Sequence, residues 1–583
     1  MAQPLPEKQC DLVMKGGITS GVVYPSAVLR LKDEYRFRSV GGTSVGAIAA
    51  AIVAAAEHGR VAGRGTGFAE LEAMNEELRQ PGLLQSLFVP RRGGRALYEV
   101  ASAAMSKRGA LHVLRVLLRH GWWALGGLLL WWASLAWAMW FLRGRWWLVP
   151  VLLGAWAVAG FVVAAMVTGR WRPAFLLASL VLALGWPALA APAAVLARGL
   201  GELGDQGFGI VSGREEGGTE ALGEWLHAHI QRAAGLPDDE PLTFGDLESS
   251  EIHLRMMTTD VAAARPVRLP GELQEFSFRP DDVRGILPEP VASRLIERGR
   301  ELAARRGLPD GDLLPMPHTD EIPILLGFRM SLAFPGLFTA VRLWSEQIQG
   351  PPRAHWFSDG GISSNFPIHF FDSWMPTRPT FGLSLGPGTG KAVEPPPKAN
   401  EARLPGWRRV ESLGGFVKAI VDTMQEWRDT MQAELPGFRD RVWEVRLAAD
   451  EGGFNIGMGP ETIARLIEKG DEAGRSIREE FDWDQHVFTR YLMAMRRLEL
   501  GLVGGIDPAG REQRGIRAAF DARREWFERP SRVELFDHDA EWLRKAAAST
   551  ERLLAEMEGW REFGGFAGQS PRPPGEMRVV PDV

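Results

Sequence analysis

One stretch of the chain decides the fold: Ser39-Val40-Gly41-Gly42-Thr43-Ser44-Val45-Gly46-Ala47-Ile48-Ala49-Ala50. The β-prone residues 35–40 lead into it, and a run of Ala, Ile and Val that continues to Ala56 is typical of a buried helix. Between them stands Gly42-x-Ser44-x-Gly46, the pattern of a nucleophile elbow. The glycines let a strand turn sharply into a helix, whose N-terminus directs free N–H groups towards the serine. The stretch therefore predicts that Ser44 is a nucleophile at the edge of a sheet.

The same pattern occurs a second time, at Gly382-Leu383-Ser384-Leu385-Gly386, and a chain with 67 glycines produces such matches by chance. This copy follows a strand-like Thr380-Phe381, but the next residues, Pro387-Gly388-Thr389-Gly390, predict a loop. Without a following helix there is no elbow. We therefore expect Ser384 to have a structural role at the end of a strand.

The composition narrows the class of protein. A length of 583 residues allows two or more domains, and a net charge of -5 argues against a nucleic-acid partner. The single cysteine, Cys10, excludes an internal disulfide and fits a reducing compartment. The first ten residues contain no apolar signal-peptide core, and no ligand cluster indicates a metal. We expect no secretion by that route, no metal and no cofactor.

A glycine-rich turn precedes the elbow by one strand. The expected strand Cys10–Met14 runs into Lys15-Gly16-Gly17-Ile18-Thr19-Ser20-Gly21, and the apolar spacing of residues 22–31 favours a helix. Such a turn can be an ordinary strand-to-helix connection, and a dinucleotide site is less favoured because G-x-G-x-x-G is absent. Its backbone N–H groups can also hold an anion. Next to a serine elbow, we expect them to hold the oxyanion of a tetrahedral intermediate.

A third motif, Asp359-Gly360-Gly361, lies within the segment 356–367 and alone would be only a turn. The glycine-rich loop, the G-x-S-x-G serine and the D-G-G aspartate, in this order, resemble the patatin-like phospholipases. The resemblance includes Arg329–Phe338 and the strand-like His253–Asp260, and covers about residues 10–90 and 245–390. One departure is that Ile18 and Ser20 stand where the family's loop, G-G-G-x-[KR]-G, has a glycine and a basic residue. Lys15 is a conjectural substitute for the missing cation.

The resemblance implies a three-layer α/β hydrolase fold with a mainly parallel sheet. It also implies a serine–aspartate dyad, with Ser44 as nucleophile and Asp359 as general base and then acid. The N–H groups of Gly16 and Gly17 would form the oxyanion hole. The remaining motif positions are Gly21, Gly42, Gly46, Gly360 and Gly361.

The dyad has one chemical requirement. A free aspartate, with a pKa of about 3.9, is a poor base for a serine hydroxyl, so burial must raise the pKa of Asp359. A conventional triad with His253, His355 or His369 stays open as an alternative, although single histidines are more often structural.

Between the serine and the aspartate lie three apolar runs, 122–142, 146–168 and 173–197. The first two are long enough to span a bilayer, and tryptophans gather near them as they do at membrane interfaces. The alternative, buried helices of a soluble domain, is disfavoured because charge is missing on every face. The third run contains Pro173, Pro187 and Pro192 and is the weakest candidate for a span.

These observations divide the chain into five parts. Residues 1–104 and 219–390 would form the hydrolase domain, and 105–218 a membrane-associated insertion with its linker. Residues 391–567 would form a mainly helical C-terminal region, and 568–583 a disordered tail. Helices are expected at 219–234, 412–435, 463–481, 485–500 and 539–560, and a further strand at 441–447.

The predicted activity is carboxylic-ester hydrolysis on a lipid, and the resemblance points to glycerophospholipids. The bilayer itself would be a partner, with the protein integral to the membrane and its catalytic domain cytoplasmic; protein partners are unknown. One alternative is a lysophospholipid or neutral-lipid esterase. Another is a catalytically inactive membrane scaffold, which the altered glycine loop keeps open and the intact Ser44 and Asp359 oppose.

Overall fold

The computed structural model describes residues 5–17, 19–91, 207–309, 311–345, 351–388, 390–397, 435–448, 450–453, 455–506, 512–522, 540–563 and 565–566, with isolated positions in 95–204 and 410–433. The three apolar runs and the predicted disordered tail lie outside these residues, as does most of the helix expected at 412–435. The chain divides into two compact units. One unit comprises 1–88, 213–335 and 340–583, and the other comprises 89–212 and 336–339.

The second unit has a small parallel pair among its described residues. Strand β3 (Gly209–Val211) pairs with β8 (Gly336–Phe338), and the Thr339 N–H donates to the Val211 carbonyl at 2.9 Å. This pairing is why a four-residue piece, 336–339, groups with a segment more than a hundred residues earlier in the chain.

The first unit is built on an 11-stranded sheet. Its strand order is β12 (Val393–Glu394), β13 (Val442–Leu447), β11 (Thr380–Pro387), β1 (Lys8–Met14), β2 (Tyr35–Gly42), β4 (His253–Asp260), β10 (Arg353–Asp359), β9 (Val341–Ser345), β6 (Ser277–Phe278) and β7 (Leu314–Pro315), with β5 (Arg265–Leu269) also paired to β4. Strands β13, β11, β1, β2 and β4 run parallel, whereas β12, β5, β10, β9, β6 and β7 pair antiparallel.

The predicted α/β class is confirmed, but the sheet as a whole is mixed rather than mainly parallel. The parallel part is its centre, where buried strands read as the continuous apolar runs that the sequence displays. The antiparallel part consists largely of short strands, and strands of two to five residues are too short to produce a periodic signal.

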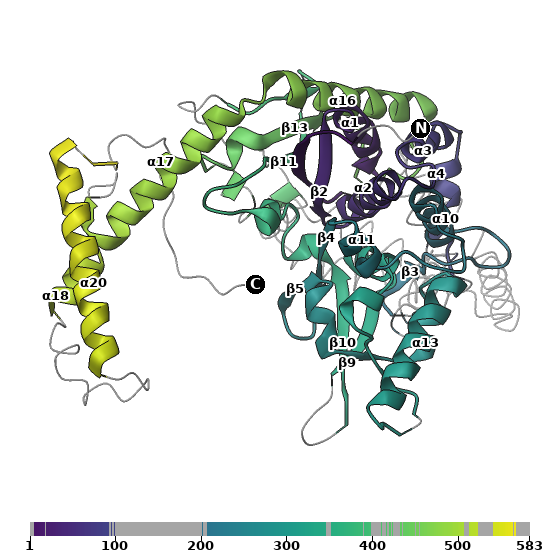
Figure 1. The fold of residues 1–583 in the computed structure, drawn as a ribbon. Helices are drawn as coiled ribbons and strands as arrows, with labels where there is room; N and C mark the ends of the chain where they lie inside the picture. Colours follow the sequence, from purple (N-terminus) through teal and green to yellow (C-terminus); the bar gives the residue numbers. More distant parts are fainter. Residues whose placement is uncertain are drawn as a thin grey trace, which may run out of the picture. The chain divides into compact units, whose positions relative to one another are not determined.

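Helices cover one face of this sheet. Helix α2 (Val45–Ala62) packs on β1, β2 and β4, with α10 (Leu222–Ala234) and α14 (Ile324–Ser331) beside it. Helices α1 (Val23–Leu31) and α16 (Pro460–Glu480) pack together near β13, and Figure 1 shows both alongside β2, β11 and β13. Trp443 of β13 donates its indole N–H to Ser476 of α16 at 3.0 Å.

The opposite face has a different cover. Val13 and Val442 project from it into a buried apolar cluster with Phe366, Ile368 and Phe438. These aromatic and aliphatic residues come from segments that contain the short 3₁₀ helices η5 (Gly360–Ile362), η6 (Ile368–Phe371) and η7 (Arg439–Arg441). The segment that follows Asp359 is therefore packed against the sheet rather than left as a surface loop.

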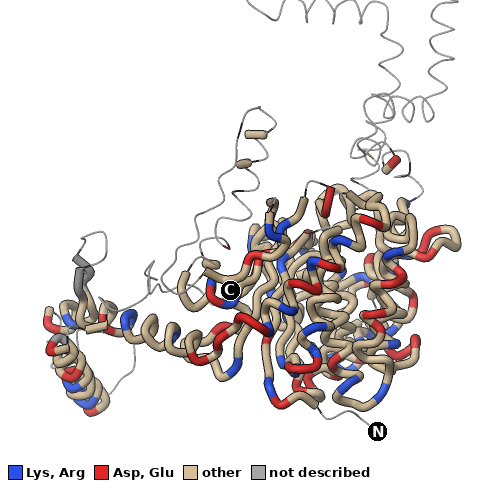
Figure 2. The backbone as a smooth tube through the Cα atoms, turned by 90° about the horizontal axis from the view of Figure 1, so that it is seen from above, with Lys and Arg blue, Asp and Glu red and all other residues tan. Residues whose placement is uncertain are grey.

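The C-terminal region is mainly helical where it is described. It contains α16, α17 (Trp483–Leu502), α18 (Ile516–Ala522) and α20 (Ala540–Glu558), together with a hairpin of β14 (Gly504–Ile506) and β15 (Glu512–Arg514). Figure 2 shows acidic and basic residues interspersed along α20, where Lys545 lies 2.7 Å from Glu541.

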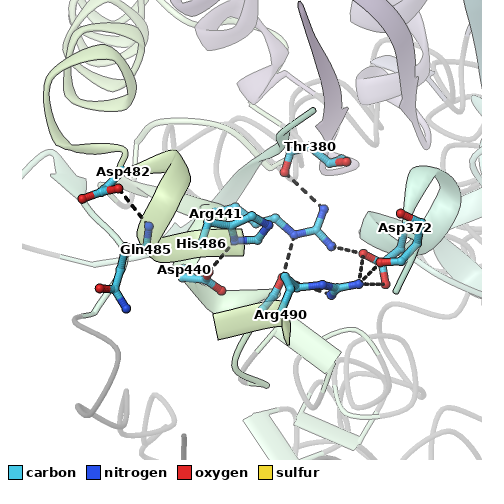
Figure 3. A network of polar contacts seen from close by, with 10 residues as sticks. Asp372, Thr380, Asp440, Arg441, Asp482, Gln485, His486 and Arg490 are labelled. Carbon is cyan, nitrogen blue, oxygen red and sulfur yellow. Dashed lines mark hydrogen bonds and ion pairs between the residues drawn. The ribbon is translucent and has the colours of Figure 1, made fainter. Parts of the chain in front are cut away.

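A buried polar network attaches α17 to the sheet (Figure 3). The Arg441 guanidinium donates to the Asp372 carboxylate at 2.7 Å and to the Thr380 carbonyl at 3.2 Å. Arg490 of α17 donates to the same Asp372 carboxylate at 3.1 Å, and His486 lies 2.5 Å from Asp440. Arg441 is only 2% exposed, so the free-energy cost of burying its charge must be offset by these partners.

Among the described helices, one is long and apolar enough to cross a membrane by length and composition: α2, Val45–Ala62. It is mostly buried against the sheet, as the core helix of a folded domain would be.

Candidate active site

The predicted elbow has the local structure that its sequence requires. Strand β2 ends at Gly42, helix α2 begins at Val45, and Ser44 between them has φ 52° and ψ −125°. A non-glycine residue with positive φ is strained, and such strain concentrates at functional sites. A Cβ atom on Gly46 would lie 2.2 Å from the Met14 carbonyl oxygen, so β1 leaves room only for glycine at this turn.

The sheet register brings Asp359 to the same place. Gly42 of β2 pairs with Met256 of β4, and Asp359 of β10 pairs with Thr258, two residues further along β4. Strand β10 runs antiparallel to β4 and pairs with it only through its last three residues. For this reason its C-terminal end, unusually for an antiparallel strand, lies near the carboxyl ends of the parallel strands.

Ser44 and Asp359 are both 3% exposed and lie close together. Burial raises the pKa of Asp359 to about 7, while the nearby Ser44 hydroxyl and the Gly361 N–H act in the opposite direction. Asp359 Oδ1 accepts the Gly361 N–H at 2.7 Å. Asp359 Oδ2 is buried without a hydrogen-bond partner among the described residues. The Ser44 hydroxyl itself donates to the Gly17 carbonyl at 3.0 Å.

The backbone around Asp359 is held from two sides. Its N–H donates to the Ala333 carbonyl at 3.0 Å, and its carbonyl accepts the Thr259 hydroxyl at 3.0 Å. The preceding Ser358 hydroxyl also donates to Ala333, at 2.8 Å. Ala333 lies two residues after the end of α14, so the turn that follows this helix holds the backbone of the Asp359 strand in place.

The glycine-rich loop reaches the serine through Gly17, whose carbonyl accepts the Ser44 hydroxyl. The Gly16 N–H is already donated to the Asn365 carbonyl at 2.8 Å, whereas no described residue accepts the Gly17 N–H. A Cβ on Gly21 would lie 2.2 Å from Val45, so this glycine allows the loop to pack on the start of α2. Ile18, the residue that replaces a family glycine, lies outside the described residues.

The Lys15 side chain points elsewhere. Its ammonium donates to the Leu385 carbonyl near the end of β11, at 3.0 Å. Burial raises the pKa of Asp429, and the Lys15 charge opposes that rise. The conjecture that Lys15 replaces the missing basic residue of the loop stays a conjecture.

Two residues that the sequence analysis did not assign support the motifs. The Ser331 hydroxyl accepts the Ser44 N–H at 3.0 Å. The Asn365 carbonyl accepts both the Gly16 N–H and the Thr43 hydroxyl, the latter at 2.9 Å, and so joins all three motifs. Ser331 and Asn365 both lie in segments quoted for the resemblance, but a hydroxyl acceptor and a backbone carbonyl have no sequence signature.

The alternative candidates have other surroundings. Ser384 lies inside β11 opposite Glu444, and three more residues of the strand follow it instead of a helix, so it is within the strand rather than at its end. His355 has both ring nitrogens engaged, with Asp260 at 2.7 Å and Ser345 at 2.8 Å. His253 is exposed at the amino end of β4, and His369 lies in η6 against the Phe370 ring. The described residues contain no group of three or more His, Cys, Asp or Glu placed to hold a metal.

Comparisons with known proteins agree with the sequence pattern. Residues 178–372 match the family model "Patatin-like phospholipase". The whole chain is 31% identical, over 667 aligned residues and 99% of each protein, to the "RpoH suppressor" of Rhizobium meliloti (strain 1021). The crystal structure of VipD from Legionella pneumophila is similar with a TM-score of 0.30 and 11% identity, over 96% of this chain and 86% of that one. The family match contains Asp359 and begins after Ser44, so the serine assignment depends on the local geometry.

Proposed function

This chain belongs to the patatin-like phospholipase family and is a lipid acyl hydrolase, and we propose that Ser44 and Asp359 are its catalytic dyad. The observation that carries the proposal is a buried carboxylate beside a strained elbow serine, with one carboxylate oxygen left unpaired among the described residues. A nucleophile and a base within reach of each other, both shielded from water, are what acyl transfer requires.

The chemistry follows from these positions. Ionised Asp359 accepts the proton of the Ser44 hydroxyl as Oγ attacks the ester carbonyl carbon, and a tetrahedral intermediate forms. The carbon–oxygen bond of the leaving alcohol then breaks, and protonated Asp359 returns the proton to that oxygen. Water, deprotonated by Asp359, attacks the acyl-enzyme. The bond between the acyl carbon and Oγ then breaks, Asp359 returns the proton to Oγ of Ser44, and the fatty acid is released. A base with a pKa of about 7 is suited to both directions of proton transfer near neutral pH.

The oxyanion would be held by the glycine-rich loop. Of the two predicted donors, the Gly16 N–H is donated to Asn365, so Gly17 is the stronger candidate. A donor that points at a developing negative charge in a site without water stabilises the transition state substantially. The motif glycines Gly21, Gly42, Gly46, Gly360 and Gly361 would keep the loop, the elbow and the aspartate turn close together.

We propose glycerophospholipids in a bilayer as the substrate, with the insertion 105–218 anchoring the enzyme to the membrane. The apolar runs 122–142 and 146–168 are long enough to span a bilayer and so support the anchor. An anchored enzyme reaches lipids of the bilayer directly, whereas a water-soluble ester would not require an anchor. A lysophospholipid or neutral-lipid substrate is the second candidate, and a scaffold without catalysis is opposed by the intact dyad.

The test is a substrate panel on the full-length protein in membranes. Phosphatidylcholine vesicles, lysophosphatidylcholine and triacylglycerol emulsions would be compared by fatty-acid release, with Ser44→Ala protein as the blank. We expect Ser44-dependent release from the vesicles first. Release only from one of the other two lipids would replace the glycerophospholipid proposal, and equal release by the Ser44→Ala protein would reject the dyad.

A further inference from the structure

Asp429 is a buried carboxylate outside every catalytic motif and outside the family match. It lies in a helical position of the C-terminal region and is 5% exposed. Its Oδ1 accepts the Ser364 hydroxyl at 2.8 Å, and its Oδ2 accepts the N–H groups of Asn365 and Phe366 at 2.5 and 2.8 Å. One side chain therefore fixes three consecutive residues of the turn that follows the catalytic aspartate.

The turn fixed in this way also holds the other two motifs. The Asn365 carbonyl accepts the Gly16 N–H at 2.8 Å and the Thr43 hydroxyl at 2.9 Å. Gly16 begins the glycine-rich loop, and Thr43 immediately precedes the nucleophile. A displacement of Asn365 would move the loop and the elbow relative to each other, while the bonds of Asp359 to Ala333 and Thr259 would stay in place.

The chemistry of the site demands a carboxylate. All three partners donate, and an ionised carboxylate is the side chain that accepts only. Burial raises the pKa of Asp429, whereas the three donors and the nearby Lys15 ammonium lower it and favour the ionised form. An asparagine of the same shape could keep the two backbone bonds only by turning its NH₂ group towards Ser364, whose hydroxyl would then accept and leave its own proton without this acceptor.

We propose that Asp429 is a positioning residue of the active site, which aligns the glycine-rich loop with Ser44 through the Asn365 carbonyl. This inference rests on the proposed Ser44–Asp359 dyad. It makes the C-terminal helical region, which contains none of the three motifs, a structural part of the catalytic site.

The test compares Asp429→Asn with a matched control, Asp440→Asn, in the full-length protein. Asp440 is also a C-terminal-region carboxylate with a buried histidine partner, His486, but it contacts no motif residue in the described structure. We expect Asp429→Asn to lower kcat about 10- to 100-fold with KM within about two-fold, because misplacement of reacting groups by about 1 Å has that effect. Labelling of Ser44 by a fluorophosphonate should slow by a similar factor. Asp440→Asn should leave both within about two-fold.

A double-mutant cycle separates positioning from general stability. Thr43→Val removes one of the two hydrogen bonds to the Asn365 carbonyl, so its effect on kcat should be non-additive with that of Asp429→Asn. If Asp429→Asn does not fold, Ser364→Ala removes one of the three donors and should lower kcat about three-fold in a folded protein. A folded Asp429→Asn or Ser364→Ala protein with unchanged kcat, or strict additivity with Thr43→Val, would overturn the inference. Activity that survives Ser44→Ala would instead reject the dyad itself.

Discussion

At the scale of single residues, we expect opposite results when each of the two G-x-S-x-G serines is replaced by alanine. Ser44 has a strained backbone next to a buried carboxylate, whereas Ser384 lies in a regular strand. Ser44→Ala should abolish fluorophosphonate labelling and fatty-acid release. Ser384→Ala should leave labelling intact, as measured by mass spectrometry of the labelled peptide. Loss of labelling in a folded Ser384→Ala protein would show that the elbow has been assigned to the wrong serine.

The raised pKa of Asp359 predicts the pH dependence of activity. A general base must be ionised, so kcat/KM should rise with pH and reach half of its plateau at about pH 7. Asp359→Asn should lower kcat by at least about 100-fold, because the amide cannot accept the proton. A pH–rate profile on a soluble ester, which keeps the vesicle surface out of the measurement, checks both. Near-normal turnover by the asparagine variant would point to a histidine base.

The raised pKa of Asp359 also predicts that the stability of the fold decreases with pH, whereas the activity increases. The pKa of Asp359 is about 7 in the fold and 3.8 for the free group, so the folded protein binds an extra proton between these values. The buried carboxyl group therefore stabilises the fold most below pH 4, and that contribution is lost as pH rises through 7. Asp359→Asn does not ionise, and at pH 8 it should be more stable than wild type by up to about 4 kcal/mol. Thermal melts at pH 4 and pH 8 would show whether the difference grows with pH.

At the scale of elements, the strand-to-helix turn depends on the absence of a side chain. Gly46→Ala would place Cβ 2.2 Å from the Met14 carbonyl oxygen of the central strand β1, which cannot move without breaking the sheet. We expect lower thermal stability and loss of Ser44 labelling together. Gly459→Ala is the control, because Gly459 has φ −75° at the start of α16 and open space around it. A Gly46→Ala protein with normal labelling would contradict the tight turn.

The apolar runs predict a topology that the described residues do not test. Ser44 precedes them and Asp359 follows, and the two lie together, so we predict that an insertion which enters a membrane crosses it an even number of times. A hairpin of 122–142 and 146–168, with 173–197 re-entrant or interfacial, satisfies this condition. Six basic residues flank the hairpin at the ends that lead to the catalytic domain: Lys107, Arg108, Arg115 and Arg119 before the first run, and Arg170 and Arg172 after the second. The turn between the runs has two, Arg143 and Arg145. The positive-inside rule then leaves the catalytic domain in the cytoplasm.

Single introduced cysteines test this topology in intact cells. Gly144→Cys should react with an impermeant maleimide, and Arg172→Cys should not. The native Cys10 is fully buried, and burial raises the pKa of its thiol, so the unmodified protein serves as the unlabelled control. Labelling at Arg172→Cys alone would reverse the orientation. Labelling at neither position would favour a segment that lies on the membrane without crossing it.

At the scale of the whole molecule, the Asp372 network joins the C-terminal helices to the sheet. Asp372→Ala would leave Arg441 and Arg490 without their shared carboxylate, and removal of one partner from a buried ion pair costs about 3–5 kcal/mol. The melting temperature should fall by several degrees. Glu541→Ala removes only the exposed pair with Lys545 on α20 and should shift it by about 1 °C or less. Equal shifts for the two variants would contradict a structural role for the network.

The sequence by itself determined the α/β class, the elbow and most of the long helices. Each of these is local: a glycine pattern on either side of Ser44, apolar runs in the central strands, and helical periodicity at positions that became α1, α10, α16, α17 and α20. Local signals of this kind survive without knowledge of the partner segments. The order of the three motifs along the chain indicated the patatin-like phospholipase family, and the comparisons support this assignment.

Only the tertiary structure decided how the site is assembled. The position of Asp359 depends on β10 pairing with the last residues of β4, and a register between distant strands leaves no local trace in the sequence. The contacts of Ser331, Asn365 and Asp429 likewise join residues that lie between 63 and 349 positions apart in the chain. The Asp359 pKa of about 7 arises from burial by all of these segments together. Burial is a property of the packed molecule. The dyad chemistry therefore required a raised pKa of Asp359, but only the packed structure shows the burial that raises it.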